Sequence, residues 1–122
     1  MAKITSYRDL FVWQEGMRLL DLVYDLTEKF PKQQQFILTS QMQRAALSIP
    51  SNIAEGHGRN TRKDYRQFCI MARGSLFELE TQCYAARKRN YISSAELADL
   101  MERTNSIGSK LGALIRSLGE NP

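Results

Sequence analysis

Hydrophobic residues recur every three or four positions in four stretches of the chain, which is the periodicity of an α-helix with one buried face. No stretch keeps the two-residue alternation of a half-buried strand. Pro31, Gly56 with Gly58, and Asn90 separate the stretches. The pattern predicts an all-α protein, with helices roughly at 8–29, 39–56, 61–89 and 94–118.

The connections between these helices are about three to nine residues long, and connections of that length favour antiparallel neighbours. A chain of 122 residues fits a single domain that can bury a core without disulfides or metal. We therefore predict one domain, residues 1–122, folded as an antiparallel up-down-up-down four-helix bundle.

The second predicted helix contains a proline, Pro50. Its apolar stripe continues through Pro50 in phase, so we expect one helix, kinked where the proline removes an amide and frees the carbonyl of Ala46. Gly56 suits the left-handed position at the end of this helix, and Gly58 continues the turn. The stripe consists of Met42, Ala45, Ala46, Ile49 and Ile53.

The first predicted helix carries two apolar strips, which together span roughly 200°, about twice the width that one core face needs. We assign the first strip to the core and expect the second to lie partly in a contact between subunits. The first strip holds Leu10, Trp13, Met17, Leu20 and Tyr24, and the second holds Val12, Leu19, Val23 and Leu26.

Two polar residues, Asn52 and Glu55, lie near the end of the second helix, beside a turn whose backbone groups need partners. We interpret them as structural, with the amide and the carboxylate tying this joint to neighbouring helices through Arg44 or Arg59. The alternative is a polar pocket.

Composition excludes several classes of function. The two cysteines, Cys69 and Cys83, are fourteen residues apart on one predicted helix, which separates them by about 21 Å and prevents a disulfide between them. One histidine and two cysteines provide no zinc-ligand spacing, and we expect no metal and no cofactor. His57 lies in a turn and is expected to be solvated. No spacing joins a nucleophile, a base and an orienting group, so we do not expect an enzyme.

The longest apolar runs are only a few residues long, too short for a membrane span or a signal-peptide core. With 43% hydrophobic and 25% charged residues the chain has a globular composition. We expect a soluble cytoplasmic protein with no membrane partner.

The net charge of +4 comes from the middle of the chain, where residues 41–90 hold nine basic and four acidic side chains. Four of the basic residues surround the start of the third helix, where positive charge opposes the helix dipole, and an anionic partner would explain them. Arg62, Arg66 and Arg73 share one face of this helix, which suits contact with a row of phosphates. The five candidate nucleic-acid-binding residues are Arg59, Arg62, Lys63, Arg66 and Arg73.

Five short segments, spread over almost the whole chain, together resemble a known family. They are residues 9–14, 38–41, 48–56 followed by Gly58-Arg59, 74–75, and 78–81. The sequence resembles the four-helix-bundle proteins encoded in intervening sequences of bacterial 23S ribosomal RNA genes, often labelled as ribosomal proteins. The resemblance covers about residues 8–118. It implies a left-handed bundle that assembles into a homopentamer, without established enzymatic activity and without catalytic residues to transfer.

We therefore expect a non-enzymatic homo-oligomeric scaffold that binds RNA or a nucleic-acid-associated protein through its basic middle segment. The alternative is a protein-protein interaction module that makes no contact with nucleic acid, its basic face being merely solvated. The third hypothesis is an enzyme, which no residue spacing in the sequence supports.

Overall fold

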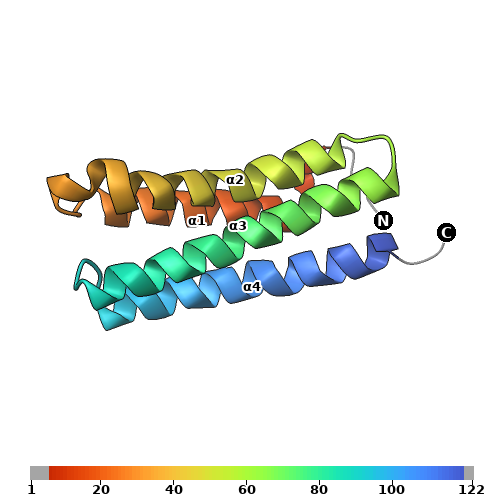
Figure 1. Cartoon of the computed structure of the whole chain (residues 1–122). Coiled ribbons are helices and arrows are strands. Elements are labelled where there is room, and N and C mark those ends of the chain that lie inside the picture. Colours follow the sequence, from red (N-terminus) through yellow and green to blue (C-terminus); the bar gives the residue numbers. More distant parts are fainter. Residues whose placement is uncertain (1–5, 120–122) are drawn as a thin grey trace.

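The computed structural model describes residues 6–119, which contain four long helices and no strand (Figure 1). The predicted all-helical class and the number of long helices are confirmed within this range. A 3-10 turn (Tyr7–Asp9) precedes the first helix, and a 3-10 turn (Lys32–Gln34) and a π-helical turn (Gln35–Thr39) join the first helix to the second. The long helices are α1 (Phe11–Thr27), α2 (Ser40–His57), α3 (Arg62–Lys88) and α4 (Ser94–Gly119).

The four long helices lie side by side along a common direction (Figure 1). Gln43 near the start of α2 donates a hydrogen bond to the hydroxyl of Thr27 at the end of α1, at 3.0 Å. Arg66 near the start of α3 reaches the carbonyl of Ile115 near the end of α4. The main pairings are α1 with α2, α2 with α3, α3 with α4, and α1 with α4. The helices α1 and α3 therefore occupy opposite corners of the bundle.

The core contains the strip of α1 that we assigned to a subunit contact. Val12, Leu19, Val23 and Leu26 are 7%, 0%, 0% and 8% exposed, and they pack with buried residues of the other three helices. The assignment of the second strip to a subunit contact is therefore wrong. Gly16, two turns before Val23, faces Pro50 of α2, and a Cβ added there would lie in ordinary contact with the proline at 3.4 Å.

The other strip of α1 is left near the surface. Trp13, Met17 and Leu20 are half-buried and Tyr24 is exposed. Trp13 also packs edge-to-face against Tyr7, with 5.2 Å between ring centroids. Leu10, Trp13 and Leu20 also pack against the core, so this strip lies at the edge of the core and is partly presented to solvent.

The helix α2 continues without interruption from Ser40 to His57, with Pro50 buried inside it. The predicted single helix is observed, whereas its bend at Pro50 and the left-handed twist of the bundle stay predictions. Gly56 is an interior residue of α2, not a left-handed cap, and within residues 6–119 no glycine has a positive φ. An added Cβ at Gly56 would lie 2.7 Å from the Cβ of Phe68, so close packing of α2 on α3 requires this glycine.

The ends of α3 and the start of α4 follow local capping chemistry. Thr61 accepts a hydrogen bond from the backbone amide of Asp64 at 3.1 Å, as expected of an N-cap. Ser93 and Glu96 form a reciprocal capping box, with bonds of 3.0 Å and 2.8 Å. Asn90, at φ 63°, takes the left-handed conformation just after α3.

Candidate functional site

The basic residues selected from the sequence gather at one end of the bundle, where α2 ends, α3 begins and α4 ends. Arg62 and Lys63 are in the first turn of α3, and Arg66 is one turn further on. Arg59 lies in the short connection before α3. We call this group, Arg59, Arg62, Lys63 and Arg66, the basic end.

Two arginines of the basic end are used to cap a neighbouring helix. Arg62 donates a hydrogen bond to the carbonyl of Ser117 at 2.5 Å, and Arg66 donates one through Nε to the carbonyl of Ile115 at 3.2 Å. The Ser117 carbonyl is among the last four of α4, which lack intrahelical partners, and both carbonyls lie near the negative end of its dipole. The positive charge of Arg62 and Arg66 at the start of α3 therefore does not need an external anion to explain it. The end of α4 supplies the negative partner.

Arg59 is held by local contacts as well. Its guanidinium forms an ion pair with Glu55 at 2.7 Å and lies over the ring of Phe68, 4.7 Å from the centroid. Both partners of the ion pair are about half exposed, so solvent screens the pair and it contributes little to stability.

Lys63 and Arg73 are the least engaged of the five candidates. Within residues 6–119 neither makes a hydrogen bond or an ion pair with another side chain or carbonyl. Lys63 is exposed at the basic end, whereas Arg73 is half-buried and lies about 10 Å further along α3 than Arg66, at 1.5 Å per residue. The structure therefore brings four of the candidates together and leaves Arg73 apart.

The polar side chains at the end of α2 interact with groups one turn away in the chain rather than with neighbouring helices. Asn52 donates its side-chain amide to the carbonyl of Ser48, one turn earlier in α2, at 2.8 Å. Glu55 contacts Arg59, four residues later. Arg44 forms no hydrogen bond or ion pair with the joint among the described residues. The ion pair of Glu55 with Arg59, one of the two predicted partners, is observed. The predicted tie of Asn52 to a neighbouring helix is wrong, because its amide bonds within α2. Gly58 is the C-cap of α2, at φ −82°.

A polar groove of about 500 Å³ lies between α2 and α3. Arg44 and Glu78 place opposite charges on its two walls. The side-chain oxygen of Gln82, one turn beyond Glu78, is buried and has no hydrogen-bond partner among the described residues. Sequence reasoning treated Glu78 as an ordinary solvated residue. The groove is lined by Gln41, Arg44, Ala45, Ser48, Ser75 and Glu78.

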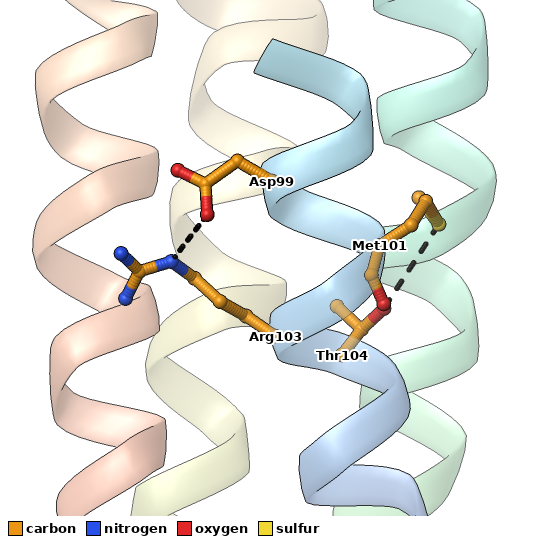
Figure 2. A network of polar contacts seen from close by, with 4 residues as sticks. All are labelled: Asp99, Met101, Arg103 and Thr104. Atoms are coloured by element: carbon orange, nitrogen blue, oxygen red, sulfur yellow. Dashed lines mark hydrogen bonds and ion pairs between the residues drawn. The ribbon is translucent and has the colours of Figure 1, made fainter. Parts of the chain in front are cut away.

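A second polar cluster joins α1 to α4. Glu15 accepts a hydrogen bond from Ser106 at 2.7 Å and forms an ion pair with Lys110 at 3.1 Å. On the same helix, Arg103 pairs with Asp99 at 3.0 Å, and Figure 2 shows this pair on one side of α4, away from the contact of Thr104 with Met101. The cluster fixes the α1–α4 seam, and sequence reasoning missed it because its partners are far apart in the chain.

Three titratable groups in α3 are shifted by burial. Desolvation raises the pKa of Cys69 to about 11 and that of Cys83 to about 12. It also raises the pKa of Tyr65 to about 12, with a smaller contribution from Cys69. Both cysteines are free, buried thiols, and a raised pKa suppresses the thiolate form that reacts with electrophiles and metals. Within residues 6–119 no three acidic, histidine or cysteine side chains converge as metal ligands.

Comparison with known proteins decides the family. The family model of the 23S rRNA-intervening sequence proteins matches residues 8–113, most of the chain. The chain belongs to this family. The resemblance drawn from the sequence motifs is thereby confirmed.

A solved structure supports the fold of this 23S rRNA-intervening sequence protein. It is the crystal structure of a protein of unknown function from the S23 ribosomal protein family of Bacteroides thetaiotaomicron, with a TM-score of 0.80 and 20% sequence identity. The match covers 85% of the present chain and 97% of the other. No curated protein matches the chain. Among the described helices of this family member, none is long and apolar enough to cross a membrane.

Several residues in or near the family segments of this 23S rRNA-intervening sequence protein fall into two structural groups. Gln41, Arg44, Ser75 and Glu78 line the groove between α2 and α3. Asn52, Glu55 and Arg59 make local contacts at the end of α2. The helical spacing of the first group could have revealed that they share walls of one groove, had the pairing of α2 with α3 been considered.

Proposed function

We propose that this protein is a non-enzymatic helical scaffold that assembles with copies of itself. The observation that carries the proposal is the outward apolar strip of α1, with Trp13, Met17 and Leu20 half-buried and Tyr24 exposed. A contiguous apolar strip of this kind on a small domain marks an interaction surface.

An exposed residue of α2 extends this strip. Gln43 contacts α1 at Thr27, and Pro50 contacts α1 at Gly16. Leu47 is four residues after the first and three before the second, so it lies on the same face of α2, beside the middle of α1. Its exposure is therefore part of the same surface. We take five copies as the expected number, which follows from the family resemblance and not from the geometry.

Sedimentation velocity of the full chain at micromolar concentration tests assembly. We expect a discrete species several times heavier than the 14.0 kDa chain. Leu20→Asp should shift the protein to monomer, because a carboxylate placed in an apolar contact must be desolvated. Ser109→Asp, at an exposed position of α4, is the matched control and should assemble like the parent. A parent protein that sediments only as a monomer would refute the scaffold.

A second candidate function is contact with RNA or with a nucleic-acid-associated protein, and the free positive charge at the basic end favours it. Lys63 is exposed and makes no ion pair within residues 6–119, and Arg62 and Arg66 keep further donors beyond the one each gives to α4. In a cyclic assembly this charge repeats around the ring, so weak contacts add through multivalency. The competing possibility is a protein-interaction module without nucleic acid.

Titration of a structured RNA at several salt concentrations separates these two possibilities. Phosphate contacts give an affinity that falls steeply with salt, whereas a solvated basic end gives no measurable binding at any salt concentration. We also place the protein in the cytoplasm, a proposal that its two free cysteines support, because reducing compartments keep thiols unpaired.

A further inference from the structure

The surface of α3 carries a second apolar strip, separate from that of α1. Ile70, Phe77 and Tyr84 follow one another at intervals of seven residues, and seven residues turn a helix by almost two full turns, so the three share a face. Phe77 and Tyr84 are each 54% exposed, and Ile70 is half-buried. We call these three residues the α3 strip, and Trp13, Met17, Leu20 and Tyr24 the α1 strip.

The two strips match in length and do not compete for space. Trp13 to Tyr24 spans eleven residues, about 17 Å, and Ile70 to Tyr84 spans fourteen, about 21 Å, at 1.5 Å per residue. Because α1 and α3 occupy opposite corners of the bundle, both strips are available on the same copy at the same time. A partner seated on one does not block the other.

The α1 strip is bordered by negative charge. Leu20 and Tyr24 line a shallow hollow of about 380 Å³ together with Asp21 and Asp25. Both aspartates are exposed and make no ion pair within residues 6–119. Glu28, exposed at the end of α1, adds a third carboxylate one turn later.

The border of the α3 strip carries two cations and one carboxylate, Glu80, which lies three residues after Phe77 and four before Tyr84. Arg73 lies three residues after Ile70 and four before Phe77, which places it beside the strip between them. Lys88 lies four residues after Tyr84, on the same face. Within the described range neither cation forms an ion pair. The position of Arg73 beside the α3 strip therefore accounts for this residue without a bound phosphate.

We propose that the α1 strip of one copy docks on the α3 strip of the next copy, in a head-to-tail contact. The inference rests on the proposed self-assembly and says which two faces meet. A symmetric contact between two α1 strips would set Asp21 and Asp25 against their own copies, and one between two α3 strips would oppose cations. The head-to-tail contact pairs apolar strip with apolar strip, and it sets the acidic border of the α1 strip against a border of net positive charge on α3. Contacts of this type generate closed rings when the rotation between copies closes.

Two variants, each with one damaged face, test the contact. In the first, Asp21→Arg and Asp25→Arg reverse the border of the α1 strip. In the second, Phe77→Ser and Tyr84→Ser remove the apolar anchors of the α3 strip. All four positions are exposed, so folding is expected to be preserved, and circular dichroism checks this. The matched control, Glu102→Arg, reverses an exposed charge on α4.

The head-to-tail contact predicts that each variant alone is monomeric in sedimentation, with its self-association weakened about 100-fold or more, as for loss of interface hot spots. Mixed in equal amounts, the variants should form a heterodimer of twice the 14.0 kDa chain mass and stop there. Each variant contributes one intact face, so one contact forms and no third copy can add.

Other outcomes overturn the inference in distinguishable ways. If the Phe77→Ser/Tyr84→Ser variant assembles like the parent, α3 takes no part and the contact is between α1 strips. If both variants are monomeric and the mixture stays monomeric, the two faces do not meet each other. If the parent itself is a monomer, the proposed self-assembly has failed, and this inference fails with it.

Discussion

Arg62 and Arg66 stabilise the fold by capping α4, and the consequence can be measured. Changing both to glutamine removes two positive charges from beside the last turns of α4. A cation at a helix C-terminus contributes about 0.3–1 kcal/mol when exposed and up to about 2 kcal/mol when partly buried. Arg62 is exposed and Arg66 is half-buried. We therefore expect the double variant to lose about 1–2 kcal/mol of unfolding free energy.

Urea unfolding followed by circular dichroism gives this loss directly. Lys63→Gln is the matched control, because Lys63 is in the same turn of α3 but donates no hydrogen bond to α4 within the described residues. Its unfolding free energy should stay within about 0.5 kcal/mol of the parent, as for most surface substitutions. The protein concentration is held constant throughout, because assembly stabilises the folded state by mass action.

The dependence on salt provides a second readout. Screening weakens the interaction of exposed charges with a helix dipole, so the difference between the parent and the double variant should shrink in 1 M salt. If the double variant and Lys63→Gln unfold at the same urea concentration, the capping role is wrong. The positive charge at the start of α3 would then again need an external anion to explain it.

Three further predictions follow from the described contacts. Gly56→Ala should cost about 1–3 kcal/mol of unfolding free energy, because the added Cβ would lie 2.7 Å from that of Phe68. Gly74→Ala should stabilise the protein by about 0.5–1 kcal/mol, because an added Cβ there meets nothing within 4 Å. Denaturant melts in which both variants shift equally would contradict this. Burial raises the pKa of Cys83 to about 12, so this thiol keeps its proton to higher pH in the folded state than in the unfolded state. The unfolding free energy should therefore fall above about pH 9, by up to about 1.4 kcal/mol per pH unit. In urea melts between pH 9 and 11 the unfolding free energy of Cys83→Ala should fall less steeply than that of the parent, and parallel curves would refute the role of this thiol. If the basic end binds RNA, Lys63→Gln should reduce the logarithmic salt slope of binding by about one while leaving assembly unchanged, and an unchanged slope would remove this residue from the interface.

The sequence by itself determined the helices and many of their ends, because those depend on neighbours within one or two turns. Periodicity of three and four placed four long helices. The spacing of Ser93 and Glu96 specified a capping box that the structure contains. Asn90 marked the end of α3, where it takes the left-handed conformation. The motifs at residues 48–56 and 78–81 also pointed to the correct family.

Only the tertiary structure decided which side of each helix faces the core, a neighbouring helix or solvent. Both strips of α1 are apolar, and helical periodicity places them on the helix without showing which one faces the bundle axis. The contact of Gly16 with Pro50 is one of those that orient α1. The dipole of α3 by itself disfavours Arg62 and Arg66 at its start, whereas the carbonyls that bind them belong to α4, about fifty residues away in the chain. The sign of an electrostatic interaction is set by the nearest groups in space. Those groups become neighbours only when the helices pack.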